Sequence, residues 1–424
     1  MAEQHGKALV PQIRFAGFTD PWEQRKLGEL YQKNDERNTD GLGSERTLSV
    51  ASMTFNSAGN GADDSSLPNY KRLRLGDIAF EGHANKEFAY GRFVLNDAGN
   101  GIMSPRFTCL RPIAEQEYSF WKYFIHSEKV MRPILVNSTK SGTMMNELVV
   151  EDFLKQEILV PPLPEQCRIG AFFDRLDSLI TLHQRKYDKL CVLKKSMLDK
   201  MFPKGGSLYP EIRFAGFTDP WEQRKLGEVA TFGGGHTPSM SDSDNYEGGN
   251  VLWVTSQDVK SHYLDGTTTQ ITEKGAKELT LYPAGSLVMV TRSGILRHTL
   301  PVAELRKPST VNQDIRVILP QENYYGQWLL QFFISRNKEL LLEFGKTGTT
   351  VESVDFSKMR DMVLLTPSLP EQQQIGRYFA RLDNLITLHQ RKYCGVVSWM
   401  LGVALVRLGS ESDGAFGEMK HVLR

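Results

Sequence analysis

The sequence predicts an α+β fold made of two tandem copies of one domain, each followed by a long helix. The two helices are expected to pair as an antiparallel coiled coil about a pseudo-two-fold axis. Three observations support this prediction: a long internal repeat, a shared order of β-rich and helical segments between the repeats, and an alternating three-and-four spacing of apolar residues. A chain of 424 residues is also long enough for several domains.

The repeat consists of two segments that occur twice. Residues 13–29, IRFAGFTDPWEQRKLGE, recur unchanged at 212–228, and residues 163–187 return at 369–393 with 19 of 25 positions identical. We call these four segments the frame. The inserts between them, residues 30–160 and 229–366, share almost no direct sequence. The predicted parts are therefore residues 1–160, a helix over 161–204, residues 205–366, a helix over 367–400, and an atypical tail over 401–424.

The two inserts keep one order of features. Each has a β-rich run, RLRLGDIAF at 72–80 and LYPAGSLVMV at 281–290. An aromatic helical patch follows, at 120–130 and 328–341. A small polar loop, KSGT at 140–143 and KTGT at 346–349, then precedes a hydrophobic strand and the LPEQ tetrapeptide. Two copies of one domain are implied.

The frame helices carry the clearest periodicity. A helix over 165–201 would be roughly 55 Å long at about 1.5 Å per residue. Because an apolar stripe needs a partner, each helix is expected to pack against the other. We expect the repeated histidines to pack in this stripe rather than to act in catalysis. The predicted seam residues are Ile169, Phe173, Leu176, Ile180, His183 and Tyr187, and then Ile375, Phe379, Leu382, Ile386, His389 and Tyr393.

Composition and motifs argue against an enzyme, a membrane protein and a metalloprotein. The content of 40% hydrophobic and 24% charged residues is typical of a soluble globular chain. The start has no apolar leader and the longest uncharged apolar stretch, 394–406, falls short of the ~18 residues of a membrane span, so we expect a cytoplasmic protein. The four cysteines lie far apart without CxxC spacing, which predicts reduced thiols and no metal site.

Nucleotide and methyl-donor motifs are also missing. GKTGTT at 345–350 looks like a phosphate loop, but Leu340 stands where that motif needs glycine. No NPPF or DPPY tetrapeptide and no complete GxGxxG occur. The net charge of +1 does not by itself indicate nucleic acid. We therefore expect no catalytic residue and no cofactor in this chain.

The combination of duplicated GFTDPWEQRKLGE, a variable domain and an LPEQ-initiated long helix resembles type I restriction-modification specificity subunits, over residues 11–393. The resemblance implies that the variable blocks are target recognition domains, each reading half of a split double-stranded DNA site. It also implies that the helices act as spacers and as docking surfaces for two methyltransferase subunits, and that two restriction subunits join the complex. S-adenosylmethionine, ATP and Mg²⁺ would then belong to those partners.

Two unlike readers on a stiff spacer would recognise an asymmetric bipartite site. The alternative is a protein-interaction scaffold built from a duplicated coiled-coil module, which would not need unlike inserts. Residue types that contact phosphates or base edges mark the DNA-binding candidates, although surface charge or a plain turn before a strand could also explain them. They are Lys71, Arg72, Lys86, Arg92, Arg106, Lys140, Ser141 and Thr143 in the first insert, and Gln257, Arg292, Ser293, Lys346, Thr347 and Thr349 in the second. The repeated Trp22 and Trp221 should be structural, because a DNA contact would vary with specificity.

The repeat breaks after Tyr393. The first copy continues with the lysine-rich DKLCVLKKSMLDKMFPK, whereas the second continues with CGVVSWMLGVALVRLGSESDGAFGEMKHVLR. Gly395 and Gly402 would each cost about 1 kcal/mol relative to alanine inside a helix. We interpret this as a frameshift or recombination junction near codon 394, with a genuine variant ending as the alternative.

Overall fold

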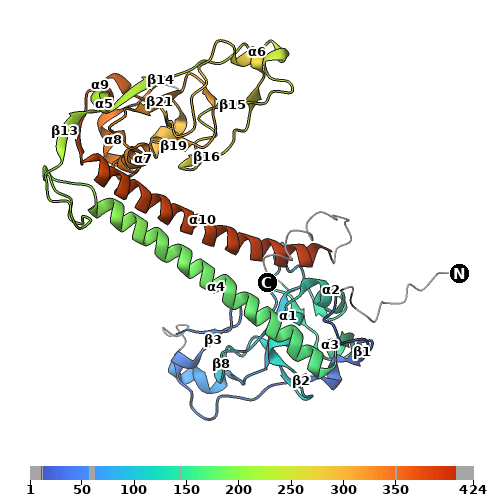
Figure 1. Cartoon of the computed structure of the whole chain (residues 1–424). Helices are drawn as coiled ribbons and strands as arrows, with labels where there is room; N and C mark the ends of the chain where they lie inside the picture. The colour runs from blue at the N-terminus through green and yellow to red at the C-terminus, as the bar shows by residue number, and fades with distance from the viewer. Residues whose placement is uncertain (1–10, 12, 57–62, 143–144, 349–350, 407–424) are drawn as a thin grey trace. The chain divides into compact units, whose positions relative to one another are not determined.

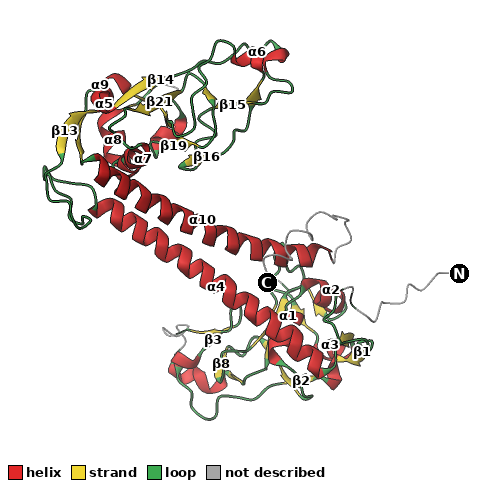
Figure 2. Ribbon diagram, viewed as in Figure 1, coloured by secondary structure: helices red, strands yellow, loops and turns green. Residues whose placement is uncertain are grey.

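The computed structural model describes residue 11 and residues 13–56, 63–142, 145–348 and 351–406, with side chains described to residue 392. The chain forms two compact units, Met1–Thr181 and Leu182–Arg424, whose boundary falls inside helix α4 (Leu163–Lys200). The course of the chain can be followed in Figure 1. Figure 2 shows that short strands and loops make up most of each unit and that α4 and α10 (Leu369–Val406) are the longest elements. Among the described residues, no helix is long and apolar enough to span a bilayer.

Unit 1 is built on an antiparallel four-stranded sheet in the order β2-β9-β6-β7. Helix α1 supplies Trp121 and helix α3 supplies Phe153 to the core, where they pack with Phe80 and Phe93 of the sheet. The sheet strands are β2 (Tyr31–Lys33), β6 (Ile78–Glu81), β7 (Arg92–Leu95) and β9 (Thr108–Pro112). The two-stranded ribbons pair β3 (Leu48–Ser49) with β4 (Thr54–Phe55), β5 (Lys71–Leu73) with β8 (Gly101–Met103), and β10 (Thr139–Lys140) with β11 (Glu147–Leu148). The helices are α1 (Tyr118–Phe124), α2 (Glu128–Val136), α3 (Val150–Lys155) and the 3-10 turns η1 (Leu27–Glu29), η2 (Ser44–Arg46) and η3 (Asp64–Asn69).

Unit 2 holds a five-stranded sheet in the order β14-β21-β18-β19-β16, in which only β16 and β19 run parallel. Its strands are β14 (Ala230–Gly233), β16 (Tyr263–Leu264), β18 (Leu287–Val290), β19 (Val302–Leu305) and β21 (Ile315–Pro320). A three-stranded sheet joins β15 (Val251–Val254), β17 (Gln270–Ile271) and β20 (Thr310–Val311), and β22 (Gly345–Lys346) pairs with β23 (Ser353–Val354). The helices are α5 (Leu226–Val229), α6 (Glu273–Ala276), α7 (Gly326–Ser335), α8 (Asn337–Phe344), α9 (Phe356–Arg360) and the turns η4 (Ser243–Asn245) and η5 (Gly294–Arg297).

The predicted order of features is confirmed in both inserts. The β-rich runs contain β6 and β18, and the aromatic patches form α1 with the start of α2, and α7 with most of α8. The described parts of the small polar loops, residues 140–142 and 346–348, lie in the β10–β11 and β22–β23 hairpins. Each hydrophobic strand before LPEQ is present as β12 (Glu157–Val160) or β24 (Val363–Thr366). The α+β fold class is therefore as predicted.

The frame closes each insert with a two-stranded ribbon. In unit 1, β1 (Glu23–Lys26) runs antiparallel to β12, and in unit 2, β13 (Glu222–Lys225) runs antiparallel to β24 in the same way. The residue after each frame strand extends the pattern, since the Leu27 N–H donates to the Gln156 carbonyl at 2.9 Å and the Leu226 N–H donates to the Met362 carbonyl at 3.0 Å. These hydrogen bonds join backbone groups, so they do not depend on which side chains the insert carries. The two ends of an insert are thus held together whatever its sequence.

A buried ion pair joins the frame segment to the start of each long helix. The Arg14 guanidinium donates from Nε and Nη2 to the two carboxylate oxygens of Glu165, both at 2.7 Å, and Arg213 does the same to Glu371 at the same distances. Glu165 is 0% and Glu371 1% exposed. Bidentate, charge-assisted bonds of this kind offset the high cost of burying a carboxylate. The hydrogen bonds that Arg213 donates to Glu371 also raise the pKa of Arg213.

The glutamine after each of these glutamates ties the long helix to the insert. Gln166 accepts hydrogen bonds from the Glu117 N–H and the Trp121 indole N–H, both at 3.1 Å, at the start of α1. Gln372 accepts from the Tyr325 N–H at 2.9 Å, at the start of α7. Both glutamines also donate to a proline carbonyl five residues earlier, at 2.9 Å. The LPEQ tetrapeptide therefore links two parts of each unit: its glutamate binds the arginine of the first frame segment, and its glutamine binds the insert.

A repeated glycine lets the same helices pack closely. A Cβ at Gly170 would lie 2.7 Å from the Phe120 backbone nitrogen, and one at Gly376 would lie 3.0 Å from the Trp328 backbone nitrogen. Such distances to backbone leave no room for a methyl group. The repeated sequence LPEQ-x-x-IG therefore specifies how α4 packs on α1 and how α10 packs on α7.

Both long helices are close to their predicted bounds. Helix α4 covers 163–200 where 165–201 was expected. Helix α10 continues through Gly395 and Gly402 to Val406, beyond the boundary predicted at residue 400. Two glycines, at a cost of about 1 kcal/mol each, do not end the helix.

Within unit 2, the final part of α4 runs antiparallel to α10. The His183 and His389 rings meet with their Nδ1 atoms 2.9 Å apart, and these histidines occupy equivalent frame positions. Further along α4, Lys194 Nζ donates to Asp383 Oδ1 at 2.6 Å. Because higher numbers on α4 meet lower numbers on α10, the pairing is antiparallel, as predicted. Leu190, Met197 and Leu198 of α4 pack against the unit 2 core.

Several predicted seam residues also belong to the cores of the two units. Ile375, Phe379 and Leu382 are buried in the unit 2 core beside α7, and Ile169 packs against the unit 1 core. Leu176 is buried, whereas Phe173, Ile180, Tyr187 and Ile386 are half-buried. The side chain of Tyr393 lies outside the described residues. The first half of each stripe is therefore part of a domain core, and in unit 2 that core is also contacted by the end of α4.

The Arg–Glu pairs predict a large and specific loss of stability when one partner is removed. Glu371→Gln leaves the Arg213 charge buried without its counter-charge, which should destabilise unit 2 by roughly 3 kcal/mol. Glu165→Gln should do the same in unit 1. The matched control is Glu222→Gln, an exposed glutamate paired with Arg224, which should change stability by less than about 0.5 kcal/mol. Hydrogen exchange measured peptide by peptide separates the two units, and equal protection in Glu371→Gln and Glu222→Gln would contradict the assignment.

The histidine pair predicts a loss of stability in acid. Burial, and then the positive charge on His389, lower the pKa of His183. The folded state therefore binds this proton less readily than the unfolded state, so the stability is present above about pH 6.5 and is lost as pH falls below it. We expect the melting temperature of the natural chain to fall more than that of His183→Gln between about pH 7.5 and about pH 5.5. His126 and His262, whose pKa values burial also lowers, affect both proteins equally. Parallel curves would show that the pair does not titrate with folding.

Candidate nucleic-acid interface

The second-insert candidates gather where β18 ends. The strand stops at Val290, and the next residues run beside the β22–β23 hairpin: Arg292 forms a bridge with Ser353, and the Ser293 N–H donates to the Glu352 carbonyl at 3.1 Å. The hairpin carries Lys346 on β22 and Thr347 at its tip. Four candidates from two distant parts of the sequence are thus brought to one place. The side chains of Arg292, Lys346 and Thr347 are exposed there.

Two further loops border this place. The Thr291 N–H donates to the Asp314 carbonyl at 2.8 Å, and the Asn312 N–H donates to the Val254 carbonyl at 3.0 Å. The loop after Val254 is shaped by Asp258, which accepts from the Thr255 N–H at 2.8 Å. That turn leaves Gln257 exposed. Gln257 therefore lies in a loop beside the same end of the sheet as Arg292.

Two cations near this surface, Lys346 and Arg297, pair with neighbouring carboxylates. Lys346 pairs with Asp355 at 2.8 Å and keeps the pKa of that carboxyl low, and Arg297 pairs with Glu352. Exposed pairs of this kind contribute about 1 kcal/mol or less. A phosphate oxygen accepts the same charge-assisted hydrogen bonds as a carboxylate oxygen.

The first insert gathers its candidates at the equivalent end of β6. The register pairs Phe80 with Thr108 and Glu81 with Arg92, so the loop that follows β6, the start of β7 and the turn before β9 lie together. These segments carry Lys86, Arg92 and Arg106. The β10–β11 hairpin, with exposed Lys140 and Ser141, joins them, because the Asn146 N–H donates to the Gly82 carbonyl at 2.8 Å.

The side chains at this end differ in how firmly they are held. Arg92 is half-buried, pairs with Glu81 at 2.8 Å and lies 5.2 Å from the centre of the Phe88 ring. Lys86, Arg106 and Lys140 are exposed, and within the described part of the chain none of these three forms an ion pair. Arg106 lies 4.8 Å from the centre of the Phe107 ring.

Lys71 and Arg72 do not lie on this surface, which corrects the expectation for these two residues. They are 6% and 8% exposed in β5. Lys71 pairs with Asp35 at 3.2 Å, and Arg72 pairs with Asp40 at 2.9 Å. A buried, neutralised cation is poorly placed to contact DNA. The alternating sequence around Lys71 and Arg72 is typical of an amphipathic strand with one exposed face. In the structure, Asp35 and Asp40, from a loop earlier in the chain, pair with these two cations on that face.

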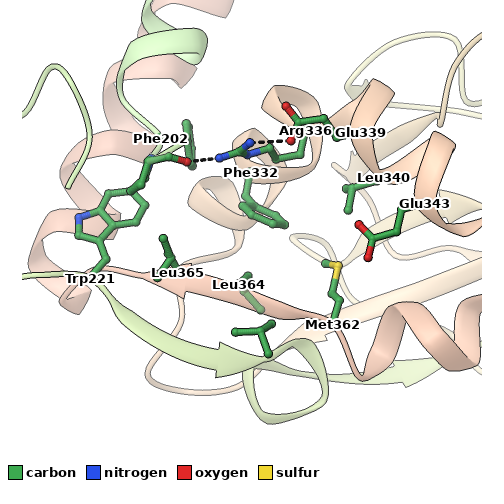
Figure 3. Close-up of a pocket in the computed structure, with 12 residues that line it drawn as sticks. Phe202, Trp221, Phe332, Arg336, Glu339, Leu340, Glu343, Met362, Leu364 and Leu365 are labelled. Atoms are coloured by element: carbon green, nitrogen blue, oxygen red, sulfur yellow. Dashed lines mark hydrogen bonds and ion pairs between the residues drawn. The ribbon is translucent and has the colours of Figure 1, made fainter. Parts of the chain in front are cut away.

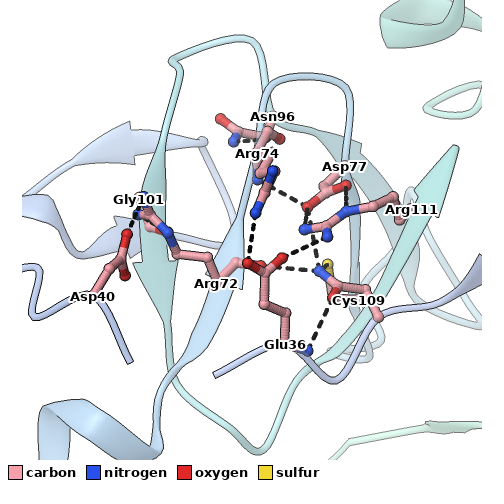
Figure 4. Close-up of polar contacts among 10 residues, drawn as sticks. Glu36, Asp40, Arg72, Arg74, Asp77, Asn96, Gly101, Cys109 and Arg111 are labelled. Atoms are coloured by element: carbon pink, nitrogen blue, oxygen red, sulfur yellow. Dashed lines mark hydrogen bonds and ion pairs between the residues drawn. The ribbon is translucent and has the colours of Figure 1, made fainter. Parts of the chain in front are cut away.

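The surroundings of Arg72 form a structural polar network at the opposite end of β6 (Figure 4). Arg111 donates to both oxygens of the buried Asp77, at 3.0 and 2.9 Å, and to Glu36 at 2.5 Å. Arg74 and then Arg111 keep the pKa of Glu36 low. Asn34 also donates to Asp77, at 3.2 Å. The network stabilises the loop before β3 and leaves little charge for a ligand.

Several outcomes complete the set of predicted residues. Thr143 and Thr349 lie outside the described residues. Trp221 is buried, and the Trp22 indole donates to Glu165 at 3.2 Å, which fits a packing role for both.

Sequence reasoning missed Arg297 and Gln313, which are exposed near Arg292. They come from separate loops without a shared motif, so no sequence signal marks them. Within the described part of the chain, no group of three or more metal-ligating side chains could hold a metal ion.

Comparison with known proteins identifies the family. The model of the type I restriction modification DNA specificity domain matches the chain twice, at residues 19–191 and 218–395. The chain belongs to this family. The two matches fall one in each half of the sequence, so the chain contains two copies of the domain.

Individual relatives agree with the family match. The chain is 32% identical over 166 residues to the type I restriction enzyme EcoR124I/EcoR124II specificity subunit of Escherichia coli. It is 29% identical over 171 residues to the MjaIX specificity subunit of Methanocaldococcus jannaschii. These alignments cover 39% of this chain in both cases, and they span 41% and 38% of the two relatives, or about two fifths of their length. The crystal structure of the type I restriction-modification S subunit from M. genitalium superimposes with a TM-score of 0.52 at 13% identity, covering 95% of this chain and 100% of that one, which supports the shared fold.

Proposed function

We propose that this specificity subunit reads an asymmetric, bipartite double-stranded DNA site, one half with each unit. One observation carries the proposal. Apart from Lys71 and Arg72, the described candidate residues of two inserts without direct sequence similarity lie at corresponding places, near the end of β6 in unit 1 and of β18 in unit 2. A shared position with different side chains is what two readers of different half-sites require.

The chemistry of the two surfaces suits this task. In unit 2, Arg292 and Gln257 are side chains that form paired hydrogen bonds with guanine and adenine edges, and Lys346 suits a phosphate. In unit 1, Lys86, Arg106 and Lys140 supply exposed positive charge. The hairpin tips add small hydroxyl donors to these cations. Positive charge fixes the position on the backbone, and the paired donors select the bases.

The frame supplies the docking surfaces for the partners in this proposal. Two methyltransferase subunits and two restriction subunits would join the chain, and S-adenosylmethionine, ATP and Mg²⁺ would be bound by them. Both long helices carry large apolar side chains that remain exposed in unit 2, which is unusual for a surface without a partner. They are Leu182, Val192 and Leu193 on α4, and Leu385 and Leu388 on α10. The specificity subunit itself contributes recognition and no catalytic step.

The hairpin lysines test the proposal. Lys140→Ala and Lys346→Ala should each weaken binding of the methyltransferase complex to its methylation site and reduce the salt dependence of the affinity by about one phosphate contact. The matched controls are Lys26→Ala and Lys225→Ala, exposed lysines of the frame strands β1 and β13. Binding is measured by fluorescence anisotropy across a salt series. If frame and hairpin variants had equal affinities and slopes, the proposed surfaces would be wrong.

A further inference from the structure

An exposed glutamine, Gln313, lies in a turn beside Arg292. The Thr291 N–H donates to the Asp314 carbonyl at 2.8 Å, so Arg292 and Gln313 each lie one residue from this junction. Asn312 holds the turn, because its Oδ1 accepts from the Asp314 N–H at 3.1 Å and the residue is only 6% exposed. The backbone of Gln313 is therefore fixed by both of its neighbours.

The end of the Gln313 side chain is also held. The Thr237 hydroxyl donates to Gln313 Oε1 at 2.7 Å, which sets the direction of the side chain and the orientation of its amide. An amide oxygen has two lone pairs, so Oε1 keeps one acceptor site, and Nε2 keeps two donors. One acceptor and a neighbouring donor thus remain for a ligand.

The loop that carries Thr237 is itself rigidly held. Three aromatic side chains donate hydrogen bonds to backbone carbonyls at alternate positions of this loop, on both sides of the threonine. They are Tyr282 to Gly234 at 2.8 Å, Trp253 to His236 at 3.3 Å, and Tyr246 to Pro238 at 2.7 Å. Gly235 lets the loop pack on the segment before the turn, because a Cβ there would overlap the Val311 carbonyl oxygen.

This arrangement suits recognition better than stability. The bond between Thr237 and Gln313 is exposed, and water can replace such a bond at little net cost. Its main effect is to restrict a glutamine side chain, whose freedom would otherwise be lost on binding. A paired contact with adenine needs an acceptor for the N6 amino group and a donor for N7. These are the groups that Thr237 leaves available on Gln313.

The corresponding position in unit 1 has a different residue. Two residues after each copy of the first frame segment, the chain pairs with a proline, Pro112 in unit 1 and Pro320 in unit 2. Counted back from these prolines, Gln313 corresponds to Pro105. A proline side chain has no donor or acceptor. The amide therefore belongs to the part of the domain that differs between the two inserts.

We propose that Gln313 reads an adenine in the half-site bound by unit 2 and that Thr237 is its positioning residue. Gln313 Nε2 donates to adenine N7, and Oε1 accepts from the adenine N6 amino group while it keeps its bond to Thr237. The inference rests on the proposed function, since it assigns one base contact of the same surface.

The test uses the complete methyltransferase complex. Sequencing the methylome of a host that carries the natural chain gives the bipartite site, and duplexes with one base pair changed at a time are then compared by fluorescence anisotropy. Gln313→Ala should weaken binding to the natural site roughly 10- to 100-fold and abolish the preference for adenine at one position of one half. The preferences at the other positions, and throughout the other half, should remain.

A double-mutant cycle tests the role of Thr237. Thr237→Val should weaken binding roughly 2- to 10-fold and lower the adenine preference at the same base pair. The double variant should lose no more than Gln313→Ala alone, because the hydroxyl acts through the glutamine. The matched controls are Thr231→Val, exposed in β14, and Gln321→Ala, exposed beyond the other end of β21. Neither should change affinity or preference.

A second region of unit 2 provides a further control. A cavity of about 280 Å³ is lined by Trp221, Phe332 and Met362, with Glu339 and Glu343 beside them (Figure 3). Its lining comes from α7, α8, β24 and the segments next to α4 and β13, rather than from the loops around Gln313. Glu343→Gln changes an exposed side chain there and should leave every base preference intact.

Two results would overturn the proposal. One is an adenine preference that survives in Gln313→Ala, and the other is an equal loss of affinity on every duplex, which is the behaviour of a phosphate contact. Lys346→Ala separates these results from failure of the proposed function. If Lys346→Ala weakens binding and Gln313→Ala does not, the base assignment alone is wrong. If neither variant changes binding, the proposed surface of unit 2 is wrong as well.

Discussion

The buried pairs between Arg14 and Glu165 and between Arg213 and Glu371 are the constraint on which the architecture depends. Each links a frame segment to the first turn of a long helix, and the neighbouring Gln166 or Gln372 links that turn to the insert. A charge buried in this way is costly unless its partner is present. The frame segment, the insert and the helix must therefore assemble together in each unit.

This constraint explains how the same frame accepts unlike inserts. The ribbons β1–β12 and β13–β24 bring the ends of an insert together through backbone bonds, and LPEQ contacts the insert mainly at the first turn of α1 or α7. The remaining insert surface, including the hairpin tips with Lys140 and Lys346, lies away from these joints in sequence and is free to vary. Recognition and assembly thus occupy different residues of one domain.

Much of this organisation could be predicted from the sequence because it is repeated. The duplication, the order of elements and the antiparallel pairing of the long helices could be predicted from the internal repeat and from the spacing of apolar residues. The assignment of loop candidates to one insert or the other could be predicted in the same way. Burial of Lys71 and Arg72 could not be predicted, because it depends on Asp35 and Asp40 folding over β5. That the start of each stripe also joins a domain core was missed for a similar reason: Phe379 suits a coiled-coil seam as well as it suits the domain core of which it is part.

The central claim, that two independent readers share one frame, is tested most directly by exchanging residues 229–366 for the insert of another family member. The exchanged chain is expressed with its methyltransferase partners, and the methylated motif is determined by sequencing the methylome of the host. One half of the bipartite motif is expected to change while the other half, read by unit 1, stays the same. A change in both halves would contradict it.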